Sequence, residues 1–257
     1  MRFLCSDIHG DYDKYQKALE IVGDDELIIV GDAIDRGDDG FRILLDTMER
    51  KNVTLMMGNH EAMMSESLFG KGLHGHAWLE SCNGGEATAR AFMRAVKKKE
   101  VDEEALEDYL LHLPVSIDYG DIYLVHGQPV LDTRPGDATL DKPVIHYLDD
   151  YSKSELELCL WKSCFEIGVG SRVFNRLQKK RGHRTTYYVG HVMTQYVTQY
   201  KSYELAKMVD KGDGQILMLS TDDGSEMYDL DGGCAMRSGL SYLILYCLDL
   251  DEVIIIR

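Results

Sequence analysis

Residues 27–32 read Leu27-Ile28-Ile29-Val30-Gly31-Asp32, a short apolar run that ends in a glycine and an aspartate. A run of this length that is rich in Ile, Leu and Val is typical of a buried strand rather than a helix. Four more runs along the chain have the same design, and each ends in a polar or glycine-rich turn. We therefore predict strands at residues 2–5, 27–30, 53–57, 122–125 and 187–189.

Helical patterns separate the first three of these strands, because residues 12–22 and 41–48 carry apolar side chains at helical spacing. The alternation of strand and helix favours an α/β core, in which ligands bind beyond the carboxyl ends of the strands. Later runs are typical of antiparallel strands, and a second sheet would make the fold a sandwich flanked by helices. These later runs are residues 215–219, 227–230, 240–248 and 253–256.

Two polar regions interrupt this pattern. Residues 62–114 read as mainly helical, and we expect them to form a helical cap or insertion within a single domain that spans residues 1–257. Residues 132–184 read as helix and loop, and we expect the basic run at 179–181 to be a solvated helix end.

The composition restricts the partners of the protein. A formal net charge of −16 repels nucleic-acid backbones, so we expect no nucleic-acid partner. The same charge repels phosphorylated substrates, so a phosphate site would need local positive charge from metal ions or arginine. No apolar run has the length of a membrane span or a signal peptide, and the six cysteines are scattered without a CxxC pair. We therefore expect a cytoplasmic protein with reduced thiols and no membrane partner.

The ends of the predicted strands carry side chains that bind metals. Taken singly, each is a common turn former, helix cap or packing residue. Their recurrence at five strand ends beside glycines favours a shared metal site. Oxygen and imidazole donors without a thiolate suit Mn, Fe or Zn, and two ions about 3.5–4 Å apart can activate a water for attack on phosphorus. The residues are Asp7, His9, Asp32, Asn59, His126 and His191.

Three of these turns resemble the signature blocks of the phosphoprotein phosphatase family of calcineurin-like metallophosphoesterases, in its bacterial and phage lambda branch. The blocks are Asp7-Ile8-His9-Gly10, Gly31-Asp32-Ala33-Ile34-Asp35-Arg36-Gly37 and Gly58-Asn59-His60-Glu61, and His126 and Gly190-His191 are similar to the later histidine blocks. The resemblance implies a four-layer α/β/β/α sandwich and a metal-dependent phosphatase.

The resemblance also implies a role for each site residue. Asp7 and His9 would bind a first divalent ion and Asp32 would bridge both ions. The second ion would be bound by Asn59, His126 and His191. We expect Mn²⁺, with Fe and Zn as alternatives.

Three further residues would act on the substrate. His60 would be the general acid, and Asp35 would hold its other ring nitrogen. Arg36 would grip the phosphate oxygens, which Asn59 and His60 would also contact. For Arg36, the alternative is a surface ion pair with Asp35, Asp38 or Asp39.

Some positions depart from the family pattern or fall outside it. Lys162 and Ser163 follow Trp161 where the lambda-type enzyme has an arginine, and Lys162, Arg172 and Arg134 are candidates for the missing phosphate contact. The other histidines have no motif support, and we expect surface or loop roles for them; they are His74, His76, His112, His146 and His183.

Three functions are compatible with these motifs. The first is a serine/threonine protein phosphatase, and the second is a hydrolase of diadenosine tetraphosphate or another small phosphorylated metabolite. Because both use the same metal core, the motifs leave the choice of substrate open. The third is a non-catalytic phosphate-binding module, which is disfavoured because every metal-ligand position and His60 are present.

Overall fold

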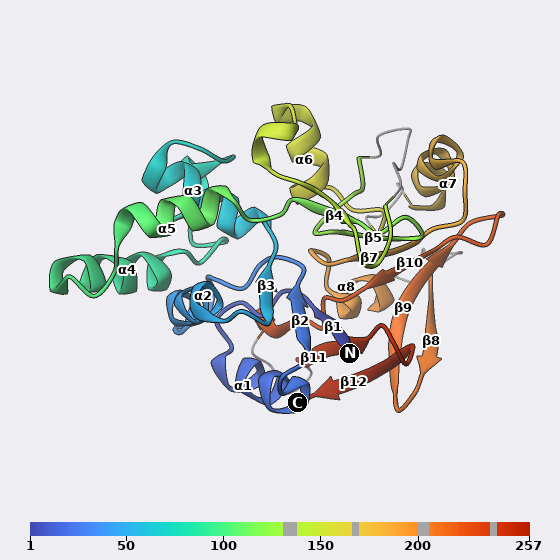
Figure 1. Cartoon of the computed structure of the whole chain (residues 1–257), viewed down its shortest axis with the longest axis horizontal. Coiled ribbons are helices and arrows are strands. Elements are labelled where there is room, and N and C mark those ends of the chain that lie inside the picture. Colours follow the sequence, from blue (N-terminus) through green and yellow to red (C-terminus); the bar gives the residue numbers. More distant parts are fainter. Residues whose placement is uncertain (131–137, 166–169, 200–205, 237–240) are drawn as a thin grey trace.

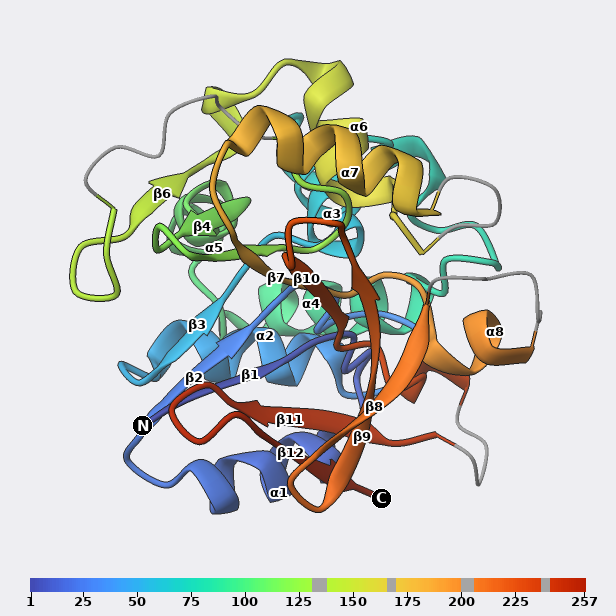
Figure 2. The ribbon, with the colours of Figure 1, turned by 90° about the vertical axis from the view of Figure 1, so that its right-hand side faces the viewer.

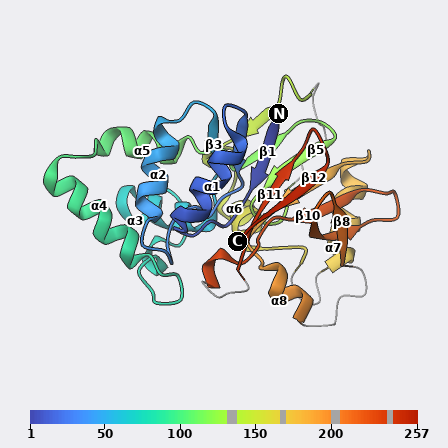
Figure 3. The same ribbon diagram turned by 90° about the horizontal axis from the view of Figure 1, so that it is seen from below.

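A computed structural model describes residues 1–130, 138–165, 170–199, 206–236 and 241–257. Its first sheet has the strand order β12-β11-β1-β2-β3. Strands β1, β2 and β3 are parallel, whereas β11 and β12 are antiparallel additions on the β1 side. Figure 3 shows β11, from the end of the chain, beside β1. The bounds are β1 Arg2–Cys5, β2 Glu26–Ile29, β3 Val53–Leu55, β11 Leu243–Cys247 and β12 Glu252–Ile256.

The second sheet has the order β6-β4-β5-β7-β10-β9-β8. Its central strands β5, β7 and β10 are parallel, and the outer strands are antiparallel to their neighbours. The carboxyl ends of β5 and β7 therefore lie at the same edge. The bounds are β4 Ser116–Asp118, β5 Ile122–Val125, β6 Val144–His146, β7 Thr186–Val189, β8 Lys207–Lys211, β9 Gly214–Ser220 and β10 Glu226–Asp229.

Helices cover the outer faces of both sheets (Figures 1 and 2). Helices α1 and α2 contact the first sheet, and α7 contacts β9 of the second. Figure 2 shows α6 and α7, the two sheets and α1 as successive layers, which is the predicted four-layer α/β/β/α sandwich. No helix of the described residues could cross a membrane. The bounds are α1 Tyr12–Val22, α2 Gly40–Glu49, α6 Lys153–Trp161, α7 Gly170–Arg181 and α8 Thr194–Gln199.

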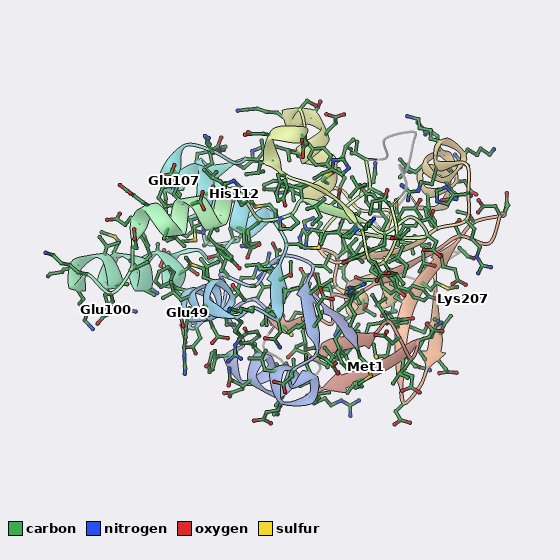
Figure 4. The ribbon with its side chains drawn as sticks, viewed as in Figure 1. Met1, Glu49, Glu100, Glu107, His112 and Lys207 are labelled. Atoms are coloured by element: carbon green, nitrogen blue, oxygen red, sulfur yellow. The ribbon has the colours of Figure 1, made fainter. Side chains whose placement is uncertain are left out.

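The segment between β3 and β4 is helical. It contains α3 (Asn59–Phe69), α4 (Glu86–Lys98) and α5 (Glu103–Leu111), with a 3-10 turn at Gly75–Ala77. Figure 1 shows α4 and α5 extending to one side of the sandwich, and Figure 4 shows Glu100 and Glu107 on the outside of this end. Its treatment as a cap or insertion within one domain stays a prediction.

Residues 3–5 of β1 and 27–29 of β2 are apolar without interruption because both faces of the sheet are buried there. Leu4 and Ile28 face the core between the two sheets, together with Tyr188 from the second sheet. Their neighbours Phe3 and Leu27 face the helices instead. Successive side chains of a strand point to opposite faces, so a strand that is covered on both sides has no polar position to alternate with.

The structure corrects the predicted division of strands between the sheets. Strands β5 and β7 do not continue the first sheet but form the centre of the second, and β11 and β12 return to β1. The later strands are therefore not a separate antiparallel sheet. Strands β4, β6 and β8 were not predicted, because they are short or polar. The predicted run at 240–248 corresponds to β11 from Leu243, and residue 240 lies outside the described residues.

The basic run at the end of α7 also differs from expectation. Lys179 and Lys180 are exposed, as predicted, but Arg181 is buried. Its guanidinium makes a bidentate ion pair with Asp118 of β4, with N···O distances of 2.5 and 2.6 Å. A bidentate pair can offset the cost of removing both charges from water, so the third cation of the run anchors α7 to the second sheet.

Candidate active site

The six predicted metal-binding residues meet where the two sheets adjoin. Asp7 and His9 follow β1, Asp32 follows β2, and Asn59 begins α3, the next element after β3. From the second sheet, His126 follows β5 and His191 follows β7. All are buried except His191, which is partly exposed. Five strand ends from two sheets thus contribute to one site.

Asp32 lies at the centre of this site. Its Oδ2 is 3.6 Å from His9 Nε2 and 3.4 Å from His126 Nε2. Two groups of side chains could each hold a metal ion: His9, Asp32 and His60 in one, and Asp32, His126 and His191 in the other. Within each group the ligand atoms lie within 4.8 Å of one another, and Asp32 belongs to both.

Asp7 and Asn59 complete the predicted set. Asp7 Oδ1 is 3.7 Å from His9 Nε2, while Asp7 Oδ2 accepts hydrogen bonds from the Ser6 hydroxyl and the His191 backbone N–H. Asn59 Oδ1 lies 3.1 Å from both His126 Nε2 and His191 Nδ1. The structure therefore brings together all six residues that the motifs single out.

Backbone carbonyls fix the tautomers of two histidines. His9 Nδ1 is 3.0 Å from the Ile34 carbonyl, and His126 Nδ1 is 2.9 Å from the Val30 carbonyl. Because a carbonyl can only accept, each Nδ1 carries a proton, and the Nε2 that faces Asp32 is the nitrogen that can bind a metal once it is deprotonated. Metal-binding histidines are commonly held in this way through their second ring nitrogen.

The backbone at the site adopts conformations that non-glycine residues rarely use. The φ angles are 54° at Asp7, 47° at His9, 53° at Asp32 and 75° at His191. Each such residue costs of the order of 1–3 kcal/mol and persists only where its surroundings enforce it. Close approach is also built in, because a Cβ on Gly58 would lie 2.2 Å from Asp32 Oδ1.

Electrostatics at the site favours positive charge. Burial raises the pKa of Asp7, and the nearby charge of Asp32 raises it further. Burial of His126 lowers its pKa, but the Asp32 carboxylate outweighs burial and raises that pKa to about 10. Burial lowers the pKa of His191 to about 3, and His126 adds to the effect. Two buried carboxylates with imidazole and amide groups around them fit divalent cations.

His60 and Asp35 form a buried pair beside the predicted metal-binding residues. His60 Nδ1 is 2.8 Å from Asp35 Oδ2, and both side chains are fully buried. His60 Nε2 has no hydrogen-bond partner among the described residues and lies 3.8 Å from Asp32 Oδ2. Burial lowers the pKa of His60, but the carboxylates of Asp32 and Asp35 outweigh it, so that the pKa is raised above its usual value.

Arg36 is an exposed residue whose guanidinium reaches the site. Its Nη1 lies 3.2 Å from His9 Nε2. Two of the three alternative ion-pair partners have other contacts, because Asp35 Oδ2 bonds to His60 and Asp39 lies 3.9 Å from Arg42. The guanidinium therefore adds positive charge at the mouth of the site.

The sequence profile of the family described as calcineurin-like phosphoesterase matches residues 3–212, which is most of the chain. The chain belongs to this family. It is accordingly a metal-dependent phosphatase with residues that can hold the metal ions its family uses. No curated protein sequence is significantly similar to the chain.

Solved structures share the fold of this calcineurin-like phosphoesterase. A cold-active protein-tyrosine phosphatase of a psychrophilic Shewanella species matches with a TM-score of 0.55 and 15% identity, over 100% of this chain and 80% of that one. A protein serine/threonine phosphatase from Saccharomyces cerevisiae gives 0.53 and 13%, over 100% and 79%. A metallophosphoesterase from Sphaerobacter thermophilus gives 0.52 and 14%, over 100% and 88%. At these identities the similarity concerns the fold alone.

The sequence patterns gave no role to Glu61, whose carboxylate the structure places against the turn that carries Asp32 in this phosphoesterase. Its carboxylate accepts hydrogen bonds from the backbone N–H groups of Asp32, Ala33, Ile34 and Gly58, at 2.9–3.3 Å. The Glu61 carboxylate therefore stabilises both the turn after β2 and the N-terminus of α3. Its position three residues after Gly58, the N-cap of α3, is that of the glutamate in a capping box, and this spacing is the signal that could have revealed it.

The structure describes two of the three candidates for the missing phosphate contact. Lys162 and Arg172 are exposed, and Arg134 lies outside the described residues. His74 is partly exposed and bonds to Glu157 of α6, with 2.7 Å between Nε2 and Oε2. The structure thus gives His74 a contact between two surface segments, in keeping with the expected loop role.

Proposed function

We propose that this chain is a dinuclear metal-dependent serine/threonine phosphatase of the phosphoprotein phosphatase type. The observation that carries the proposal is the position of Asp32, whose carboxylate belongs to both potential metal-binding groups. A carboxylate in this position can bridge two cations, and the His60–Asp35 pair lies directly beside it.

The ligands divide into two sets around Asp32. We assign Asp7, His9 and Asp32 to the first ion, and Asp32, Asn59, His126 and His191 to the second. When bound, two divalent ions would supply Lewis-acid charge and an activated water for attack on phosphorus. The mixture of carboxylate, amide and imidazole donors favours Mn²⁺, with Fe and Zn as alternatives.

The chain's own residues supply the other parts of the reaction. His60 donates a proton from Nε2 to the leaving oxygen, and Asp35 orients the ring through Nδ1. Arg36 binds the phosphate oxygens through its planar guanidinium, and Asn59 and His60 contact the same group. Each of these side chains lies within or beside the cluster around Asp32.

Two observations support an alkyl phosphoester as the substrate. A serine or threonine alkoxide is a poor leaving group that needs a proton. The buried His60–Asp35 pair can donate this proton as a general acid. In addition, an open pocket of about 330 Å³ at Gly10 is lined by four aspartates and by Lys14, which is paired with one of them; the aspartates are Asp11, Asp13, Asp38 and Asp39. Such acidic walls repel the extra charges of a polyphosphate and tolerate a basic peptide.

A substrate panel tests the proposal. Purified protein loaded with Mn²⁺ is assayed on p-nitrophenyl phosphate, on phosphoserine and phosphothreonine peptides with lysine or arginine neighbours, and on diadenosine tetraphosphate, with and without a chelator. We expect chelator-sensitive hydrolysis with the highest kcat/KM on the peptides. Preference for diadenosine tetraphosphate would make the chain a nucleotide hydrolase, and no hydrolysis at full metal loading would favour a phosphate-binding module.

The proposal for the cellular compartment rests on the chemistry of the cysteines rather than on the fold. All six cysteines are free thiols in the structure, and five of them are buried. We propose that the protein acts in the cytoplasm, where thiols stay reduced.

A further inference from the structure

Residues 78–88, which run from the end of the 3-10 turn at Gly75–Ala77 into the first turn of α4, lie against Asp35 and Arg36. We propose that Trp78 of this segment is a positioning residue that orients Asp35 toward His60 and thereby sets the rate on esters with poor leaving groups. This inference rests on the proposed function, because it assumes that His60 donates a proton. No motif in the sequence points to Trp78.

Trp78 and His60 share one oxygen atom of Asp35. The indole Nε1–H of Trp78 donates to Asp35 Oδ2 at 2.9 Å, and His60 Nδ1 lies 2.8 Å from the same oxygen. Trp78 is 2% exposed, and Asp35 and His60 are 0% exposed. Water therefore cannot replace the indole as a donor without a rearrangement of the core.

The rest of the segment holds the backbone of the same two residues. Asp35 and Arg36 have φ angles of 68° and 59°, which non-glycine residues seldom adopt. The Asp35 N–H donates to Thr88 Oγ1 at 3.2 Å, and the Arg36 N–H donates to the Gly84 carbonyl at 3.1 Å. Residues 78–88 thus fix both the main chain and the carboxylate of Asp35.

Two glycines allow this close approach. A Cβ on Gly84 would lie 3.0 Å from Arg36 Cα, and a Cβ on Gly85 would lie 2.6 Å from Trp78 Nε1. Larger residues at either position would push the segment away from Asp35. The indole is therefore held by close contact with the main chain at Gly85 as well as by its hydrogen bond to Asp35.

The indole bond determines the rotation of the carboxylate. Asp35 Oδ1 is buried and has no hydrogen-bond partner among the described residues, so the two donors on Oδ2 are what fixes the plane of the group. Without the indole N–H, the carboxylate can turn, and the His60 ring then loses its set direction. Proton donation suffers, whereas the metal ligands and Arg36 keep their places.

The test compares two leaving groups in two variants. Trp78→Phe removes the N–H and keeps a ring. Tyr15→Phe is the matched control, because Tyr15 is also fully buried and donates to a carboxylate, Asp46 Oδ2, at 2.7 Å. For Trp78→Phe we expect kcat on a phosphoserine peptide to fall by about tenfold or more, while kcat on p-nitrophenyl phosphate changes by less than about twofold. Tyr15→Phe should leave the ratio of the two rates unchanged.

Equal losses on both substrates in Trp78→Phe would overturn the inference, since a merely structural role would slow both alike. NMR gives a readout that is independent of activity. Trp78 and Trp161 are the chain's two tryptophans, so Trp161→Phe leaves one indole N–H signal. We expect this signal to lie downfield and to shift upfield when Asp35→Ala is added. An unchanged signal would overturn the hydrogen bond, whereas failure of the unmutated protein to cleave any phosphoester would overturn the proposed function instead.

Discussion

At the scale of single residues, the buried carboxylate of Asp32 explains why ionisable side chains at the site have shifted pKa values. Burial opposes ionisation of its carboxylate, but the charges of His126 and His60 outweigh burial and hold the pKa of Asp32 well below its usual range. The carboxylate in turn raises the pKa of both histidines. A buried anion surrounded by imidazoles is stable only if positive charge is present, whether from protons or from metal ions.

The role of His60 can be tested by substitution. His60→Asn removes the proton donor but keeps a polar side chain of modest size. We expect kcat on phosphopeptides to fall by about 10²–10⁴-fold, while the metal content of the protein, measured by plasma mass spectrometry, stays unchanged. Loss of a metal ion in this variant would show that His60 is a ligand, as its distance of 3.8 Å from Asp32 Oδ2 also allows.

Protonation of His126 should compete with metal binding. Its raised pKa of about 10 means that His126 is protonated at neutral pH before metal is added, and a ligand must lose that proton. We therefore expect Mn²⁺ affinity to rise by up to about tenfold per pH unit between pH 6.5 and 8.5, with protons released on titration. His191, with its pKa lowered to about 3, contributes nothing in this window. A flat affinity across it in calorimetric titrations would contradict this assignment.

At the scale of elements, Glu61 couples the end of β2 to the start of α3. One carboxylate accepts four backbone N–H groups from these two turns, including that of Asp32. In Glu61→Gln, the amide places N–H groups opposite N–H groups. We expect a loss of stability of about 3 kcal/mol in denaturant unfolding and weaker Mn²⁺ binding, because the turn that carries Asp32 is loosened. Unchanged stability and metal affinity would show that the turns hold without the carboxylate.

The elements also show how far sequence patterns reach. Strands β1 and β5 and helix α1 have the predicted bounds, because uninterrupted apolar runs and helical spacing are local signals. The six positions proposed to bind metal were found for a similar reason, since each lies within four residues of the end of a strand. Pairing between strands was not predictable, because the return of β11 to β1 is set by packing across the whole chain.

The roles of Glu61 and Trp78 were missed because their partners lie far away along the chain. Glu61 acts on a turn 29 residues away, and Trp78 acts on Asp35 from 43 residues away. Arg181 was expected in solvent because its partner, Asp118, lies 63 residues away. Contacts of this length leave no periodic trace in the sequence.

At the scale of the whole molecule, the net charge of −16 should influence substrate capture. Salt screens both the long-range repulsion of an acidic phosphopeptide and the long-range attraction of a basic one. Screening therefore favours encounter with the acidic peptide and disfavours encounter with the basic one. At saturating Mn²⁺ we expect kcat/KM to rise with ionic strength for acidic phosphopeptides and to fall for basic ones. The same salt response for both peptides would show that the net charge does not guide encounter.

The shared position of Asp32 is tested most directly by the Mn²⁺ content of the protein after dialysis, measured for the unmutated chain and for Asp32→Asn. We expect two ions per chain in the unmutated protein and fewer than one in Asp32→Asn, since this carboxylate belongs to both groups. Exposed Asp213→Asn serves as the control and should keep both ions. Two ions retained in Asp32→Asn, or no more than one in the unmutated protein, would contradict a dinuclear centre built on Asp32.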